Sequence, residues 1–214
     1  MKTLLTILCL CPWALAAQTP AKYLQGAVPL VDSRVTFTRV IPAPALAPGE
    51  IYTRLQKMTN ERFSAGEETN GSTLYTNNDE GVIICRGNEY LVFTQKALVL
   101  DRALVDYQAT YTCKPGECQL EITRVRYTYG EETKTRYTAE EWITDQHAYD
   151  KKRDKLLRGS DKFRVKTIDL VDELAALAAQ TLQTSAPVPP PVITPAAPRE
   201  NTLENTIDIL PTEI

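Results

Sequence analysis

The sequence predicts an α+β fold in which helices pack on one face of an antiparallel sheet, with a disordered tail at the end of the chain. Three observations lead to this prediction. Residues 104–129 alternate between apolar and polar side chains on both sides of a turn, as a β-hairpin does. Segments with helical periodicity lie before and after this hairpin. From Ser185 onward the chain becomes rich in proline, which is typical of a disordered, partly polyproline-like extension.

Composition indicates a single globular domain with tails. Of the 214 residues, 43% are hydrophobic and 24% are charged, values that are ordinary for a domain with an apolar core. We divide the chain into an export signal (1–17), a leader (18–27), the α+β domain (28–184) and the disordered proline-rich tail (185–214).

The start of the chain has the form of a secretory signal. Lys2 supplies a positive charge, residues 4–15 form an apolar run, and small residues at 14–17 offer a cleavage site. The run is too short to cross a bilayer, so no transmembrane segment is expected. We expect export through the general secretory pathway to the periplasm or the cell exterior; lipid anchoring at Cys11 is an alternative.

The charge of the folded part argues against nucleic acid as a partner. The chain has 24 basic and 27 acidic residues, and 23 basic residues remain without Lys2, which leaves with the signal. Without the tail, which holds Arg199 and four carboxylates, the balance is 22 to 23. A nearly neutral domain lacks the basic face by which proteins hold nucleic acid or anionic lipid.

Two cysteines flank the turn of the hairpin at 114–117. Cys113 and Cys118 would lie opposite each other in an exported protein, which favours a disulfide. A metal site is the competing interpretation, but it needs two more ligands, and His147 has no second partner nearby in sequence. We therefore expect a disulfide and no metal or cofactor. Cys85 is expected to be a buried free thiol.

Pairing the two cysteines would fix the register of the hairpin and the direction of its side chains. The expected pairs are Tyr111 with Leu120, Ala109 with Ile122, and Tyr107 with Arg124. The face expected to pack on a core carries Val105, Tyr107, Ala109, Tyr111, Leu120 and Ile122. The face expected to meet water carries Asp106, Gln108, Thr110, Thr112, Gln119, Glu121 and Thr123.

The segments before the hairpin follow in order. Residues 28–41 are rich in β-branched side chains and predict a first strand, and residues 49–63 predict a helix. Its apolar stripe consists of Ile51, Tyr52, Leu55 and Met58, with Phe63 at the far end. Two short strands, 73–76 and 81–86, are expected to form a hairpin, since the acidic turn between them lacks the spaced ligands of a calcium loop. Residues 89–104 are expected to cross the domain as an extended segment.

Two helices are expected after the hairpin. Thr138 and Glu141 form a capping box that begins a helix bearing Trp142, Ile143 and Tyr149. A second helix is expected to begin near Thr167, with acidic residues in its first turns.

Short motifs along the chain resemble a known family. They are Gly49-Glu50-Ile51-Tyr52, Trp142-Ile143-Thr144-Asp145, Lys162-Phe163-Arg164 and Thr167-Ile168-Asp169. With the order of elements, they make residues 28–182 similar to a bacterial secreted family, domain of unknown function 4468, whose fold is like half of the TATA-binding protein. The resemblance implies a curved antiparallel sheet with helices on one face. It implies no catalytic residues, and the cysteine pair and the tail are departures from it.

The chemistry of the side chains favours a protein that is not an enzyme. The sequence has no nucleophile elbow, no glycine-rich phosphate loop and no pair of metal-binding histidines. His147 is expected to be a solvated surface residue, and the carboxylate pairs 67–68, 131–132 and 140–141 are neighbours in sequence that point apart.

Two function hypotheses remain. The first is a non-enzymatic envelope protein that binds a protein partner through its polar sheet face or its tail, where residues 207–214 could dock. The second is a binder of a small apolar ligand held between helices and sheet near Tyr107, Tyr111 and Trp142. These aromatic side chains are more often simple core.

Overall fold

The computed structural model describes residues 19–64, 71–97, 99–130, 132–150, 152 and 155–183. The expected export signal (1–17) and the expected tail (185–214) lie outside the described residues, as do the carboxylate pair 67–68 and Glu131.

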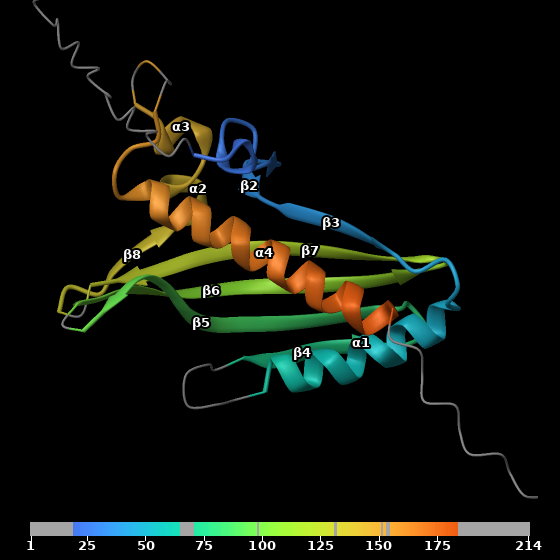
Figure 1. Ribbon diagram of the computed structural model, residues 1–214. Helices are drawn as coiled ribbons and strands as arrows, with labels where there is room; N and C mark the ends of the chain where they lie inside the picture. Colours follow the sequence, from blue (N-terminus) through green and yellow to red (C-terminus); the bar gives the residue numbers. More distant parts are fainter. Residues whose placement is uncertain are drawn as a thin grey trace, which may run out of the picture. The chain divides into compact units, whose positions relative to one another are not determined.

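The centre of the domain is a six-stranded antiparallel sheet with the order β3-β7-β6-β5-β4, in which β8 also pairs with β7 (Figure 1). The strands are β3 (Phe37–Pro42), β4 (Ser72–Asn77), β5 (Val82–Lys96), β6 (Val99–Lys114), β7 (Glu117–Tyr129) and β8 (Thr135–Thr138). A separate small ribbon, β1 (Leu30–Val31) with β2 (Arg34–Val35), follows a 3-10 turn at Ala21–Tyr23.

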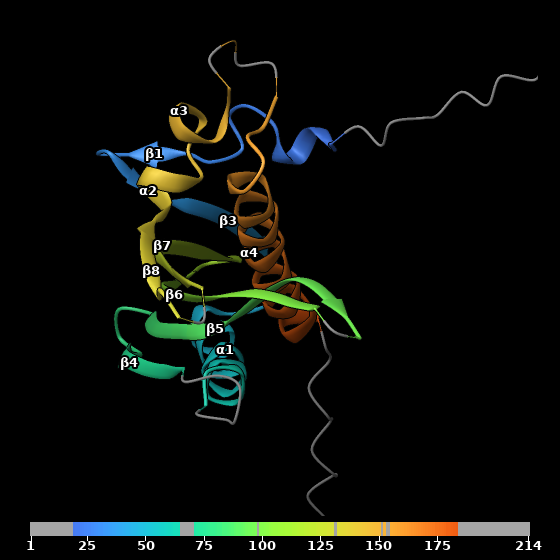
Figure 2. The same ribbon diagram turned by 90° about the vertical axis from the view of Figure 1, so that its left-hand side faces the viewer.

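Helices cover one face of this sheet. The two long ones are α1 (Pro48–Arg62) and α4 (Ser160–Gln183), and the short helices α2 (Ala139–Trp142) and α3 (Asp145–Ala148) follow β8 at one end of the sheet (Figure 2). The two long helices, α1 and α4, lie on the same side of the strands (Figures 1 and 2). The predicted α+β class with helices on one face of an antiparallel sheet is therefore confirmed.

Helix α1 and the start of α2 form as their sequences predict. Pro48 is the first residue of α1, a position at which the N–H that proline lacks would have no partner within the helix. The predicted stripe faces the core, with Ile51 and Leu55 fully buried. The capping box at α2 is present: the Glu141 N–H donates to the Thr138 hydroxyl at 3.3 Å, and the Thr138 N–H donates to the Glu141 carboxylate at 3.2 Å.

The inner face of the β6–β7 hairpin is the core of the domain. All six side chains expected there are at most 1% exposed. The pairs Tyr111 with Leu120 and Ala109 with Ile122 are confirmed. The pair of Tyr107 with Arg124 is wrong, because a β-bulge shifts the register between Asp106 and Gln108.

The bulge changes which side chains of β7 face the core. Arg124 has a φ of 56°, and Asp106 pairs with Arg126 beyond it. Before the bulge the even-numbered Leu120 and Ile122 are buried, and after it the odd-numbered Val125 and Tyr127 are buried. An extra residue in one strand thus keeps both halves of β7 packed against the helices.

The predicted disulfide is not present. Cys113 and Cys118 are register partners, as expected, but both thiols are free and buried. Cys85 is buried and free, which confirms its prediction.

Two predicted boundaries are also wrong. Residues 89–104 do not form a crossing segment; β5 runs on to Lys96 and pairs with β6 up to Val99. The last helix begins at Ser160 rather than near Thr167. Thr167 is a buried interior residue whose hydroxyl lies 2.7 Å from the hydroxyl of Tyr127.

A buried arginine joins the first turns of α4 to the N-terminal segment. The Arg164 side chain is fully buried. It donates to the carbonyls of Tyr23 (2.7 Å), Leu24 (2.5 Å) and Ile143 (2.6 Å), and to the Asp145 carboxylate (2.7 Å). One side chain therefore joins α4, the leader and the α2–α3 connection.

Candidate functional site

One face of the sheet packs against the long helices α1 and α4, and these helices do not cover the opposite face, here called the open face (Figure 2). The register places polar and charged side chains there in rows that cross the strands. One row is Asn88, Asp106, Arg126 and Thr138, and the next is Tyr90, Leu104, Thr128 and Arg136. The predicted polar residues of the hairpin, from Asp106 to Thr123, are half-buried along the same face.

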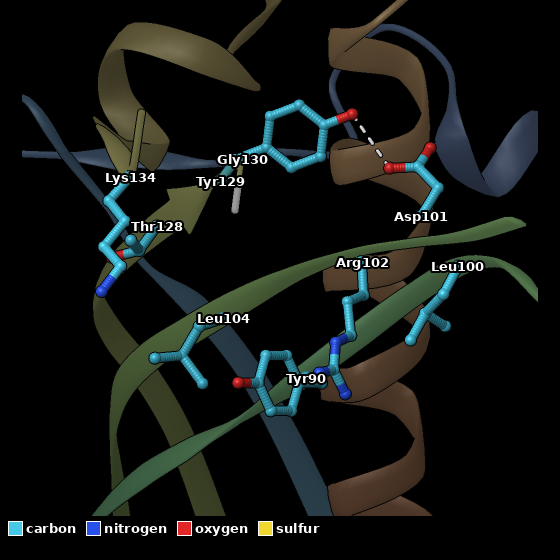
Figure 3. Close-up of a pocket in the computed structure, with 9 residues that line it drawn as sticks. All are labelled: Tyr90, Leu100, Asp101, Arg102, Leu104, Thr128, Tyr129, Gly130 and Lys134. Carbon is cyan, nitrogen blue, oxygen red and sulfur yellow. Dashed lines mark hydrogen bonds between the residues drawn. The ribbon is translucent and has the colours of Figure 1, made fainter. Parts of the chain in front are cut away.

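The first of two hollows on this face, here called the tyrosine pocket, has a volume of about 570 Å³. Its lining includes Tyr90, Leu100, Arg102, Leu104, Thr128 and Lys134 (Figure 3). The Arg102 guanidinium lies 3.9 Å from the centroid of the Tyr90 ring, a cation–π contact. At the rim, the Tyr129 hydroxyl donates to Asp101 at 2.9 Å, and Lys162 of α4 donates to the same carboxylate at 2.7 Å.

The second hollow, here called the arginine pocket, has a volume of about 520 Å³ and shares Leu104 and Thr128 with the first. Its charged lining residues are Arg86, Asp106, Arg126, Arg136 and Glu141. Arg86 donates to Asp106, through Nε at 2.7 Å, and Asn88 donates to the same carboxylate at 3.3 Å.

The protein balances only in part the other two arginines of this pocket, since Glu141 is the one further carboxylate among the described residues that line it. Within the described part of the chain, neither Arg126 nor Arg136 has an ion pair or a side-chain hydrogen bond. Glu141 caps α2, and the hydrogen bonds that its carboxylate accepts from the Thr138 hydroxyl and N–H lower the pKa of this carboxyl. Glu141 is therefore ionised at neutral pH.

The aromatic residues proposed from sequence do not line either pocket. Tyr107 is buried, and its hydroxyl donates at 2.6 Å to Glu89, which also pairs with Arg62 at 2.7 Å. Burial raises the pKa of Tyr107, so it stays protonated. Tyr111 is also buried, with no partner for its hydroxyl among the described residues.

Trp142, on α2, also faces the helix-covered side of the sheet. Its ring stacks on Tyr137 with centroids 4.2 Å apart and meets Phe163 edge-on. Its indole N–H is buried without a partner in the described residues. The structure therefore does not bring the three predicted residues together around one of the two hollows described here.

His147 and the carboxylate pair 140–141, the other residues considered from the sequence, make hydrogen bonds that support the local structure. His147 is exposed, and its Nδ1 lies 3.1 Å from the Glu140 carbonyl. Glu140 accepts from the Val35 N–H at 2.8 Å, whereas Glu141 caps α2, so the two carboxylates act separately.

Within the described ranges, no group of three or more His, Cys, Asp or Glu is arranged to hold a metal ion. No described helix has the length and apolar character that a membrane span requires.

Sequence reasoning missed the arginine pocket. Strict alternation from Leu120 onward would point Arg126 into the core, so the outward arginines become visible only with the bulge. A signal was available, since Val125 and Tyr127 are apolar and Arg124 and Arg126 are charged. That reversal of alternation indicates an inserted residue.

Comparison with known proteins agrees with this architecture. The model of a domain of unknown function (DUF4468) with TBP-like fold matches residues 37–128. A DUF4468 family protein from Bacteroides ovatus, solved by crystallography, is 37% identical, with a TM-score of 0.71 over 80% of this chain and 99% of that one. This chain belongs to the DUF4468 family.

A second solved structure supports the fold alone. A TBP-like protein from Parabacteroides distasonis is 16% identical, with a TM-score of 0.62 over 74% of this chain and 99% of that one. No match was found among the curated proteins. The resemblance identified from the sequence motifs is thus confirmed as to family and fold.

Proposed function

We propose that this DUF4468 protein is an exported, non-enzymatic binding module that contacts a protein partner of the cell envelope through the open face of its sheet. The observation that carries the proposal is that face itself, with two adjoining hollows and a surface of half-buried polar side chains. A polar face with a few apolar positions is typical of surfaces that bind other proteins reversibly.

Two features of the sequence support export. The form of residues 1–17 is that of a secretory signal, so the protein would work in the periplasm or outside the cell. The near-neutral folded part argues against nucleic acid as the partner. The tail from Ser185 is the alternative contact region, because it is longer than a simple linker needs to be.

Capture of partners from an envelope extract tests the proposal. Leu104 faces both hollows, so Leu104→Glu places a charge in the middle of the face. Leu157→Glu is the matched control, since Leu157 is 44% exposed and lines neither hollow. We expect Leu104→Glu to lose proteins that the wild type and the control both retain. The same captured set with all three would overturn the role of the face.

A chain without residues 185–214 tests the tail in the same assay. If the truncated and full chains capture the same proteins, the tail has no part in binding. Loss of the partner with the truncated chain, but not with Leu104→Glu, would transfer the function from the sheet to the tail.

Binding of a small apolar ligand is the second candidate function. The hydroxyl of Tyr111 and the indole N–H of Trp142 are buried without partners in the described residues, so a mainly apolar ligand that carries one acceptor atom would satisfy either of them. Native mass spectrometry of protein purified from its own host would show added mass if a ligand is bound. The mass of the chain alone would reject this candidate.

A further inference from the structure

The arginine pocket has one positive charge in excess. It is lined by three guanidinium groups, those of Arg86, Arg126 and Arg136, and by two carboxylates, those of Asp106 and Glu141. Arg86 is already paired with Asp106. The uncompensated charge therefore belongs to Arg126 and Arg136.

These two arginines are close neighbours in the sheet. Arg126 pairs with Thr138, and Arg136 pairs with Thr128, so they occupy diagonal positions on β7 and β8. Diagonal neighbours have their Cα atoms roughly 7–8 Å apart, within reach of each other's long side chains. Two like charges at this distance repel, and an anion between them removes the repulsion. Guanidinium groups suit a carboxylate because they can donate two parallel hydrogen bonds to it.

The adjoining tyrosine pocket offers apolar surface next to these charges. Leu104 belongs to both hollows, and the nearby Tyr90 and Leu100 are 41% and 47% exposed. A ligand that fits both hollows therefore has a carboxylate at one end and an apolar group beside it. An acidic side chain followed by an apolar one in a polypeptide has these properties.

We propose that Arg126 and Arg136 bind a carboxylate side chain from an acidic segment of the partner protein, while a neighbouring apolar side chain of that segment lies on Leu104 and Tyr90. This inference rests on the proposed function and names the chemistry of the partner. The excess of one positive charge suits a single carboxylate. A phosphate dianion, with about two negative charges, would exceed this single positive charge.

Calorimetric titration with two synthetic peptides tests the proposal. The probe is acetyl-Ser-Gln-Leu-Glu-Leu-Ser-amide, which carries one carboxylate, and its control carries Gln in place of Glu. We expect the acidic peptide to bind the wild-type protein and the Gln peptide to bind at least about tenfold more weakly, because the charge-assisted hydrogen bonds are lost. The double variant Arg126→Gln/Arg136→Gln should weaken the acidic peptide by a similar factor.

A second double variant controls for general electrostatics. Arg34→Gln/Arg158→Gln removes the same charge from exposed sites that line neither hollow, and it should leave the affinity unchanged. Urea midpoints check that both variants fold. Peptide-induced shifts of the Leu104 and Thr128 amide signals in wild-type protein provide a measurement that needs no variant.

Several outcomes would overturn the inference. They are no binding of the acidic peptide at millimolar concentration, equal weakening by both double variants, or equal affinity for the two peptides. Tighter binding of a single-stranded DNA oligonucleotide, lost with Arg126 and Arg136, would reassign the pocket to nucleic acid. If Leu104→Glu still loses the captured partner while the peptide does not bind, the proposed function stands and this inference alone fails.

Discussion

Replacing Arg164 provides a direct test of how this fold is held together. Its guanidinium makes hydrogen bonds with four partners, three backbone carbonyls and one carboxylate, at 2.5–2.7 Å. We expect Arg164→Ala to lower the free energy of unfolding by about 3–5 kcal/mol, the range for breaking a buried ion pair by removal of one partner.

The structure explains why the loss should not be larger. A hydrogen bond to a charged group contributes about 1.5–3 kcal/mol, so simple addition over the four partners would exceed that range. The Asp145 side chain is 28% exposed, however, and water can solvate its carboxylate once the arginine is gone. The carbonyls of Tyr23 and Ile143 accept in a buried setting and are left unpaired, which accounts for most of the expected cost.

Urea unfolding followed by circular dichroism measures the effect. Arg164→Lys is the informative companion, because it keeps the charge but lacks the planar fork that reaches several acceptors. We expect Arg164→Lys to be less destabilised than Arg164→Ala, and both to speed amide exchange in residues 23–26, which the guanidinium holds. A change below about 1 kcal/mol for Arg164→Ala would refute the assignment of a central role to this side chain.

Three further predictions concern single side chains. Gly87→Ala should destabilise the domain by about 1–3 kcal/mol in urea, because a Cβ there would overlap the Tyr107 ring, whereas an unchanged midpoint would show that the ring moves freely. Glu141 has a pKa lowered by its hydrogen bonds from Thr138, so its stabilising effect is complete above the unfolded-state value of 4.5 and is lost as pH falls through the folded-state pKa. The urea midpoint of Glu141→Gln should therefore fall less steeply with decreasing pH than that of the wild type. The same dependence on pH in both proteins would contradict this expectation. Burial raises the pKa of Cys85 to about 11, so iodoacetamide at mildly alkaline pH should label it only after unfolding, and rapid labelling of native protein would contradict its burial.

Much of the fold could be predicted because its signals are local. The stripe of α1 and the capping box of α2 each depend on residues within one or two turns. The inner face of the β6–β7 hairpin follows from alternation around a short turn. In such segments the side chains that face the core are apolar, and no distant partner is needed to explain them.

The wrong predictions concern segments whose structure depends on contacts with residues far away in the sequence. Arg164 and Thr167 interrupt the apolar pattern of α4, and both are buried because residues far away in sequence supply their partners. The start of that helix was therefore placed too late. In residues 89–104, a bulge between Val92 and Thr94 breaks the alternation, and Phe93 packs on Phe163 of α4. The pattern there resembled a buried segment rather than the end of a long hairpin.

The candidate site depended on the same kind of information. The polar face of the hairpin was predictable, and Asp106 was placed on it correctly. The outward position of Arg126 follows from the reversed alternation that marks the β7 bulge, whereas that of Arg136 requires the pairing of β8 with β7, for which the sequence has no local signal. Tyr107, Tyr111 and Trp142 were chosen for their size, and size alone does not distinguish a filled interior from a ligand site.

The single extra residue at Arg124 links internal packing to surface chemistry. If β7 kept Arg124 but paired without the bulge, every residue beyond it would change sides, so that Val125 and Tyr127 would meet solvent and Arg126 would turn inward. A strand without this one residue would reach the same orientation with no bulge, because alternation from Ile122 would then place Val125 inward and Arg126 outward. The orientation of the surface therefore depends on the extra residue and the bulge occurring together, and a relative that lacks both is expected to retain it.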